Sequence, residues 1–417
     1  MRILIITRFP VVELPWRIDA TTRSNLVEKQ VLRNTVLSVM ASLALAASFL
    51  TPARAQTMDR AAMVRHYAAM VHASYADTLA AALALQSAVV ALTDRPSAEA
   101  LSTAREAWVA ARDWYGQTEA YRFYGGPIDD DDGPEGRINA WPLDESYVDY
   151  VEGRANSGVI NDRHVAIDKE TLSHMNERGG EENISAGWHA IEFLLWGQDL
   201  DDDGPGNRSF MDFVDGGRAN ADRRRQYLEV ATELLVEDLR SLVDAWAPSA
   251  DNYRREFEQG GDESLRKIIV GIGSLSRGEL AGERMEVALN TQDQEDEHSC
   301  FSDNTHRDIV SNALGIQNVW LGRYVRRDGS TMTGPSLRDL VAQRDATLAR
   351  QVSARIEKSL ALTRAIQAPF DREIAGGRAA PGHQRVQQTV DSLVQQSKDL
   401  VDAANAIGIT RLTLVNP

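Results

Sequence analysis

Apolar residues recur at helical spacing along residues 58–93. They follow one another at steps of three, four and seven positions: Val64, Val71, Tyr75, Ala82, Leu85, Val89 and Leu92. This period is typical of an amphipathic helix with one face in a core. Asp94-Arg95-Pro96 breaks the pattern, and a second helix is expected from Ser97 to about Tyr124. The two segments predict a hairpin of antiparallel helices.

The same period returns in five later segments, which span about 220–246, 263–289, 303–321, 336–367 and 385–407. Residues 248–262 are polar and rich in glycine, which is typical of a domain boundary. Each half of the chain therefore supplies about four substantial helices. We predict an all-α protein of two up-and-down helical bundles in series, 56–247 and 263–417, joined by a linker at 248–262. The similar halves indicate an ancient duplication, although direct sequence repetition is faint.

Composition agrees with a folded helical protein. Of the 417 residues 43% are hydrophobic and only 6% are aromatic, while Ala, Leu, Glu, Gln and Arg abound. The formal net charge is −16, a field that repels nucleic acid and anionic lipid and attracts cations. We therefore expect no nucleic-acid partner. Cys300 is the only cysteine, so no internal disulfide forms, and we expect it to be a buried, inert thiol rather than a ligand or a nucleophile.

The N-terminal region has the three parts of a secretory signal. Basic Arg33 precedes an apolar run at 35–50, and Ala53-Arg54-Ala55 follows as an A-x-A cleavage site. We predict a signal peptide over residues 1–55, cleaved after Ala55, whose length indicates an over-extended gene start. A transmembrane anchor is the alternative, disfavoured because the run is short for a span and ends in a processing motif. The mature protein is expected in the periplasm or cell envelope, with no membrane span after processing.

Residues 187–198 combine strong hydrophobicity with two ionisable side chains. Between Trp188 and Trp196 only His189 and Glu192 can ionise. Their spacing places both on one face of a helix, within reach of a common ion or of each other. Burying an imidazole and a carboxylate costs several kcal/mol unless they are paired or bound to a metal. A structural His–Glu pair and a metal site both meet that requirement.

Two blocks resemble the signatures of a known family. The first, GWHAIEFLLWGQDL from Gly187 to Leu200, contains GxHxxE and closely resembles the signature of the imelysins, bacterial cell-envelope proteins that include iron-regulated and insulin-cleaving members. The second, QEDEHSCFSDNTH at 294–306, resembles the block typical of the family's iron-regulated branch. The resemblance runs from about residue 60 to the C-terminus. It implies a cell-envelope protein linked to iron acquisition or storage.

The second block is the densest group of metal-binding side chains in the sequence. We predict a metal site whose donors come from both blocks and from one earlier helix: His189, Glu192, Glu297, His298, Asp303, His306 and Glu119. Two donors cannot saturate a metal, because zinc takes about four and ferric iron about six, so the site is expected between the two bundles. Iron is favoured, because ferric iron is hard and binds carboxylates with some imidazole, and zinc or another divalent ion is the alternative. The competing interpretation is a solvated acidic loop in which Asp303 caps the next helix.

A metal-binding protein without hydrolytic activity is the function that these residues favour. A helical zinc peptidase needs HExxH, in which a Glu beside the first His activates the metal-bound water, and neither HExxH nor its inverse occurs. The alternative is a metallopeptidase of the imelysin type that acts on exported or external proteins, because the family's name is associated with proteolysis. We expect the metal ion as the first partner and an envelope transport or outer-membrane protein as a further one.

An acidic turn follows the first block. Asp199, Asp201, Asp203 and Gly204 match the first half of a calcium loop, in which alternate carboxylates meet a hard cation and glycine permits the turn. Phe210 then stands where a bidentate Glu should close the shell. The pattern therefore favours a plain acidic turn over a calcium site.

Overall fold

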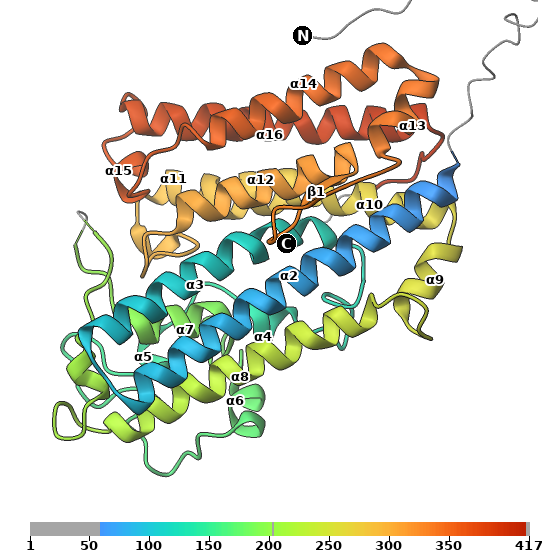
Figure 1. The fold of residues 1–417 in the computed structure, drawn as a ribbon. Helices are drawn as coiled ribbons and strands as arrows, with labels where there is room; N and C mark the ends of the chain where they lie inside the picture. The colour runs from blue at the N-terminus through green and yellow to red at the C-terminus, as the bar shows by residue number, and fades with distance from the viewer. Residues whose placement is uncertain (1–58, 202–203, 414–417) are drawn as a thin grey trace, which may run out of the picture. The chain divides into compact units, whose positions relative to one another are not determined.

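The helices of the N-terminal half pack side by side in the computed structural model, which describes residues 59–201 and 204–413 (Figure 1). Helix α2 (Arg60–Asp94) packs against both α3 (Ala98–Thr118) and α8 (Ala221–Ala245), and α7 (Gly187–Trp196) lies against α3 and α8. The Ser97 side chain accepts a hydrogen bond from the first turn of α3, so that helix begins where its cap predicts. The expected helix hairpin is present.

The C-terminal half adds a second set of long helices. Helix α10 (Asp262–Ser274) continues without a break into the π-helix η3 (Leu275–Val287) and α11 (Ala288–Thr291). Beside them lies α12 (Thr305–Leu321), and beyond it α14 (Ala346–Thr363) packs against α16 (Pro381–Ala406) (Figure 1). The layer of α12 therefore lies between the helices of the N-terminal half and the pair α14–α16.

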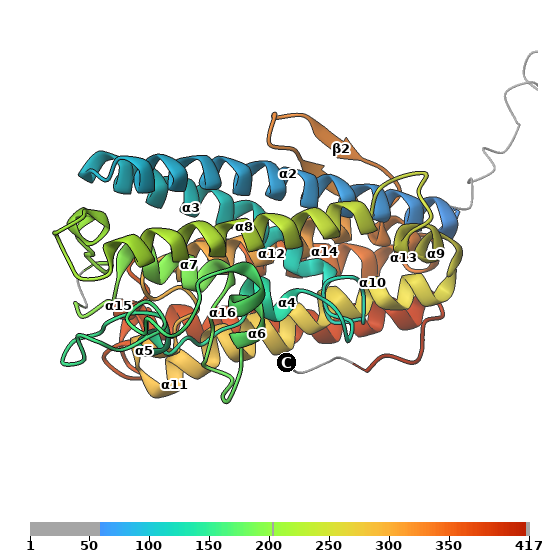
Figure 2. The ribbon, with the colours of Figure 1, turned by 90° about the horizontal axis from the view of Figure 1, so that it is seen from below.

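Short elements fill the connections. They are α4 (Glu135–Asn139), α5 (Glu145–Val148), α6 (Lys169–Met175), α9 (Tyr253–Gln259), α13 (Leu337–Arg344), α15 (Asp371–Ile374), and the 3-10 turns η1 (Glu119–Tyr121), η2 (Phe210–Phe213) and η4 (Gln294–Asp296). One antiparallel hairpin, β1 (Arg323–Val325) with β2 (Thr331–Thr333), lies beside α2 (Figure 2). Buried Asp77 of α2 accepts hydrogen bonds from Tyr324 and Arg326 of this hairpin. The predicted all-α class is confirmed, since this hairpin holds the only strands named in the described residues.

Several predicted boundaries differ from the observed ones. The expected helix over 336–367 is two helices, because the Asp345 side chain accepts hydrogen bonds from the N–H groups of Thr347 and Leu348 and so starts α14 anew. Helix α3 ends at Thr118, before the expected Tyr124, and tightens into η1. Helix α16 begins earlier than expected, with Pro381 in its first turn, where a missing N–H costs nothing.

The two halves share one hydrophobic core. A single cluster of buried side chains includes Trp108 of α3 and Ile309 of α12, and the described residues form one compact unit. The segment 248–262, predicted to be a linker, contains α9, whose buried Phe257 stacks on Tyr67 at 5.5 Å between ring centroids. The division into two bundles therefore stays a prediction about ancestry and folding. The signal-peptide prediction for residues 1–55 lies outside the described residues.

Helix α2 is long and apolar enough by length and composition to cross a bilayer. Half of its most apolar stretch is buried, and α3 and α8 pack along it. A core helix of a bundle meets the same criteria of length and composition as a membrane span. Its hydrophobicity is explained by the position of the helix inside the protein core.

Two glycines allow α3 and α12 to approach closely. A Cβ on Gly116 would lie 2.7 Å from the Cβ of Ser311, and a Cβ on Gly315 would lie 2.4 Å from the backbone oxygen of Gln117. Real Cβ atoms do not come this near, so any larger residue forces the helices apart. The two halves therefore meet at a distance that glycine determines.

We predict that Gly315→Ala lowers the free energy of unfolding by about 1–3 kcal/mol, the usual cost of overpacking. The matched control is Gly282→Ala in η3, where a Cβ would meet its nearest atom at an ordinary 3.4 Å. That control should be neutral or slightly stabilising, because alanine restricts the unfolded chain. Urea denaturation of both variants measures the difference, and equal stability would contradict the close approach.

Candidate functional site

Helix α7 carries the GxHxxE residues and is buried along its whole length. Gly187 begins the helix with a φ of +81°, and a Cβ there would lie 2.4 Å from the backbone oxygen of Ile138. Only glycine permits both this left-handed backbone and the close approach of α7 to α4. The glycine of the motif therefore has a positioning role, because it determines where His189 and Glu192 enter the core.

Glu192 holds His189 in a fixed orientation. His189 Nδ1 lies 2.9 Å from Glu192 Oε2. The other carboxylate oxygen, Oε1, accepts hydrogen bonds from the Ser302 hydroxyl at 2.6 Å and from the Ser302 backbone N–H at 3.0 Å. Burial raises the pKa of Glu192 to about 8, although the bonds from Ser302 act in the opposite direction. At neutral pH the His–Glu pair therefore shares one proton, and both carboxylate oxygens are engaged.

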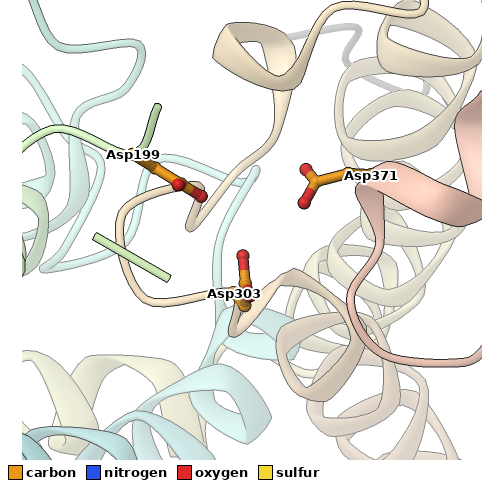
Figure 3. Close-up of side chains that lie close together, drawn as sticks. All are labelled: Asp199, Asp303 and Asp371. Carbon is orange, nitrogen blue, oxygen red and sulfur yellow. The ribbon is translucent and has the colours of Figure 1, made fainter. Parts of the chain in front are cut away.

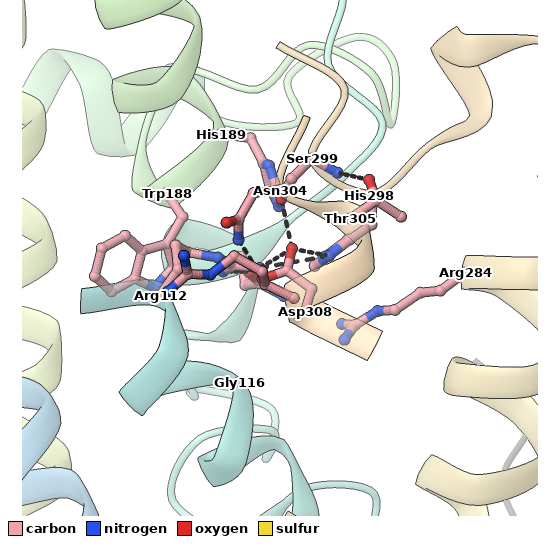
Figure 4. Close-up of polar contacts among 12 residues, drawn as sticks. Arg112, Gly116, Trp188, His189, Arg284, His298, Ser299, Asn304, Thr305 and Asp308 are labelled. Carbon is pink, nitrogen blue, oxygen red and sulfur yellow. Dashed lines mark hydrogen bonds and ion pairs between the residues drawn. The ribbon is translucent and has the colours of Figure 1, made fainter. Parts of the chain in front are cut away.

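His298 enters the same buried region from the C-terminal half (Figure 4). Its ring centroid lies 4.7 Å from that of His189, with the ring planes at 71°. His298 Nδ1 lies 3.0 Å from Asp308 Oδ2, which also accepts from Arg112 at 3.0 Å and from the Ser299 hydroxyl at 2.5 Å. An ionised carboxylate only accepts hydrogen bonds, so Nδ1 of His298 carries the proton. The two imidazoles thus meet edge to face, and each is hydrogen-bonded to a buried carboxyl group.

Both imidazoles are neutral at physiological pH. Burial and the charges of His298 and Arg112 hold the pKa of His189 well below its ordinary value. Burial and Arg284 lower the pKa of His298 to about 4. Although burial acts against it, Arg112 and His298 keep Asp308 ionised by holding its pKa well below the usual range. Within the part of the chain that the structure describes, His189 Nε2 is buried without a hydrogen-bond partner, so one nitrogen of a neutral imidazole is left unengaged inside the core.

Glu119, the predicted extra ligand, is paired with arginines. Its Oε2 accepts from Arg284 of η3 at 2.6 Å and from Arg122 at 3.0 Å. Burial acts to raise the pKa of Glu119, but these two guanidinium groups lower it to about 2. Glu119 therefore balances the charges of Arg284 and Arg122 near His298. It is not available as a metal ligand beside the two imidazoles.

Glu297 and Asp303 lie in a different group from the two imidazoles. Asp303 meets Asp199 and Asp371, and the three side chains point toward one another (Figure 3). Among residues 59–201 and 204–413, this is the group of three or more acidic, His or Cys side chains whose ligand atoms all lie within 4.8 Å of one another. Burial raises the pKa of Asp199 to about 6 and that of Asp303 to about 7, and neighbouring carboxylates add to both shifts. The alternative in which Asp303 caps the next helix is wrong, because the N-cap residue of α12 is Asn304.

His306 and Cys300 belong to neither group, although each lies near members of them. His306 Nδ1 contacts the backbone oxygen of Asp303 at 3.0 Å, and its side chain lines a surface cavity of about 480 Å³ with Trp114. Cys300 is buried as expected, and burial raises the pKa of its thiol well above the ordinary value. The contacts of His306 are with Asp303 and the lining of this cavity, so the predicted ligand set divides.

The residues that complete these groups were not singled out from the sequence. Arg112 and Asp308 lie on the buried faces of α3 and α12, beside Trp108 and Ile309. Both residues could have been identified from the sequence as charged residues on an otherwise apolar helix face. Asp371 gave no such signal, because it begins a helix of four residues.

We predict that Glu192→Gln removes a pH-dependent penalty from the metal-free protein. Between about pH 4.5 and 8 the unfolded state of the natural protein releases the Glu192 proton while the folded state keeps it, so stability falls as pH rises. Glutamine is neutral and avoids this loss. The variant should therefore gain on the order of 2–4 kcal/mol relative to the natural protein between pH 5 and pH 8.

Urea denaturation with chelator at both pH values measures this gain. The control is Glu357→Gln, a change at an exposed position of α14, which should leave the pH dependence unchanged. A stability difference between Glu192→Gln and the natural protein that stays constant with pH would refute the shared-proton interpretation.

Comparison with known proteins agrees with the family resemblance of the sequence and with the fold. The imelysin family model (Peptidase_M75) matches residues 71–400. An iron-regulated protein A from Synechococcus elongatus is 27% identical over 317 residues, which cover 73% of this chain and 75% of that protein. A crystal structure of an iron-regulated protein A precursor from Parabacteroides distasonis has a TM-score of 0.65 at 18% identity, covering 85% of this chain and 97% of that one. An imelysin-like protein from Psychrobacter arcticus has a TM-score of 0.60 at 16% identity, covering 84% and 96%. The chain therefore belongs to the imelysin family.

Proposed function

We propose that this chain is a cell-envelope protein that binds a metal ion, iron in preference to zinc, at the pair His189 and His298. The observation that carries the proposal is the approach of these two rings, 4.7 Å apart between centroids, from the two halves of the chain. The name of the Synechococcus relative, iron-regulated protein A, supports iron as the metal. The function proposed is iron acquisition or storage, with an envelope transport or outer-membrane protein as the partner.

The orientation of the two rings fits metal binding. A metal-binding histidine usually places one ring nitrogen on the metal and ties the other to a carboxylate, which fixes the ring and raises its basicity. Nδ1 of His189 contacts Glu192, and Nδ1 of His298 contacts Asp308. Nε2 of His189 has no hydrogen-bond partner among the described residues. In the metal-free state Glu192 carries the proton of its bond to Nδ1, so Nε2 carries the ring proton. An ion that binds at Nε2 would replace that proton, and Nδ1 would then donate to an ionised Glu192. Burial keeps both rings neutral, as a ligand must be.

Glu192 is assigned an orienting role first. Both of its oxygens are engaged, by His189 and Ser302, so it reaches a metal only through a remaining lone pair or after a small rearrangement. Two imidazoles leave most positions of an iron ion open. Water or the carboxylates of a chelator such as citrate would fill them. A partly filled shell suits a protein that takes up and releases its metal.

Export to the cell envelope is part of the proposal. An apolar run followed by Ala53-Arg54-Ala55 is the signature of a cleaved signal peptide. The Parabacteroides relative is described as a precursor, which agrees with processing of that protein.

We predict that His189→Ala and His298→Ala each weaken iron binding at least about tenfold, and that the double variant loses less than the sum, because both rings serve one ion. Glu192→Gln should weaken binding about 10–100-fold, as loss of an orienting carboxylate usually does. The measurement is calorimetric titration of metal-free protein, purified without a His-tag, with ferric citrate and with zinc.

His306→Ala is the matched control for this titration. Its side chain contacts a backbone oxygen next to the acidic cluster and does not reach His189, so iron affinity should be unchanged. Strictly additive losses in the double variant, or normal affinity in His298→Ala, would confine the site to α7. An equal loss in His306→Ala would place it elsewhere.

We predict that peptidase activity is absent or very low. Amide hydrolysis has a high barrier, and a metallopeptidase lowers it with a free carboxylate that activates a metal-bound water. The carboxylate beside His189 is already engaged by Ser302. Pure protein is incubated with unfolded insulin and with casein, with and without chelator. Robust cleavage that chelator abolishes and that Glu192→Gln loses would establish the metallopeptidase alternative.

A further inference from the structure

Three aspartates from distant parts of the chain converge at one point (Figure 3). Asp199 follows α7, Asp303 precedes α12, and Asp371 begins α15. Each offers a carboxylate oxygen, and these oxygens all lie within 4.8 Å of one another. Two ligand oxygens of one calcium ion, each about 2.3–2.6 Å from it, lie up to about 5 Å apart. The separations within the cluster therefore accommodate one such ion.

A fourth carboxylate, that of Glu297, lies beside the three aspartates. The Glu297 side chain is fully buried, at 0% exposure, and in the described part of the chain neither of its carboxylate oxygens has a hydrogen-bond partner of good geometry. Its neighbours are the carboxyl groups of Asp371 and Asp303 and the hydroxyl group of Thr305. Protein interiors seldom leave both oxygens of a buried carboxylate unsatisfied, because that arrangement costs several kcal/mol. Glu297 is thus the kind of group that a cation would satisfy.

The aspartates have unengaged oxygens as well. One carboxylate oxygen each of Asp199, Asp303 and Asp371 is buried without a hydrogen-bond partner among residues 59–201 and 204–413. Arg372 contributes one positive charge near Asp303, against four carboxyl groups. A divalent cation would supply the missing charge and would meet the unengaged oxygens.

We propose that Asp199, Asp303, Asp371 and Glu297 bind one hard divalent cation, calcium, at a site distinct from the pair His189 and His298. All four donors are carboxylate oxygens, which calcium prefers and which leave out the imidazole and thiolate that softer ions select. If some of the carboxylates bind through both oxygens and water molecules fill the remaining positions, this set reaches the roughly six to eight oxygen ligands that calcium takes. Asp199 also lines a surface cavity of about 820 Å³, and Asp303 is partly exposed, so an ion has a short path to the site.

A cation at this site would link three segments that are far apart in the sequence. Glu297 precedes His298, and Asp303 follows Ser302, which donates two hydrogen bonds to Glu192. A cation at the cluster would therefore hold both ends of the segment 297–303, which carries His298 and Ser302 to α7. The cation site itself does not depend on the proposed function, because none of its ligands belongs to the imidazole pair.

The test uses the mature protein, purified without a His-tag and freed of metal with chelator. We expect calcium to bind in a calorimetric titration and to raise Tm by about 5 °C at saturation, with a smaller effect of magnesium. Asp371→Asn and Asp199→Asn should each weaken calcium binding at least tenfold. In chelator these variants should be as stable as the natural protein or more so, because one of several close negative charges is removed. That result separates loss of a ligand from misfolding.

Two controls complete the experiment. Asp251→Asn changes a side chain that is 92% exposed, and it should keep the full response to calcium. His189→Ala should lose iron binding but keep the calcium response, so failure of the proposed function and failure of this site are distinguishable. No rise in Tm with calcium, or an undiminished rise in Asp371→Asn, would overturn the site. Ferric iron that displaces calcium equally from the natural protein and from His189→Ala would overturn the assignment to a divalent cation and move the iron site to this cluster.

Discussion

The ion pair of Arg112 and Asp308 is the interaction on which the rest of the site depends. Arg112 comes from α3 and Asp308 from α12, their side chains are 0% and 1% exposed, and they meet at 3.0 Å. A buried pair contributes little net stability, but removing one partner leaves an unpaired charge and costs about 3–5 kcal/mol. The pair therefore specifies how the two layers of helices meet. The glycines of α3 and α12 allow this approach, and the pair fixes its register.

The same pair determines the state of the histidines. Because Arg112 keeps Asp308 ionised, Asp308 accepts from His298 Nδ1 and fixes the tautomer of that ring. Among the described residues no arginine hydrogen-bonds Glu192, so burial dominates and raises its pKa to about 8. Two carboxyl groups, each bound to one histidine, thus hold different charges at neutral pH. Environment, and not residue type, makes one an anion and the other a shared-proton partner.

Hydrogen bonds and carboxylate contacts converge on the segment 297–303 from both sides. Glu297 has an extended backbone, with φ of −85° and ψ of 141°, and successive side chains of an extended chain point in opposite directions. Glu297 consequently joins the aspartates, while His298 joins His189. The short segment 297–303 therefore contributes side chains both to the imidazole pair and to the carboxylate cluster, and it links these two groups through the backbone.

The sequence by itself determined the helical class, most of the long helices and the family, because hydrophobic period and the two blocks are local patterns. It also singled out His189 and Glu192, as ionisable residues among apolar ones, and His298, as a member of the densest group of potential metal ligands. Both patterns can be seen in the sequence alone. Only the tertiary structure decided which candidates meet. It paired Glu119 with Arg284, set His306 apart, and brought Asp371 to Asp199 across about half of the described chain. Contacts between residues so distant in sequence depend on how helices pack, and helix packing is not encoded in any local spacing.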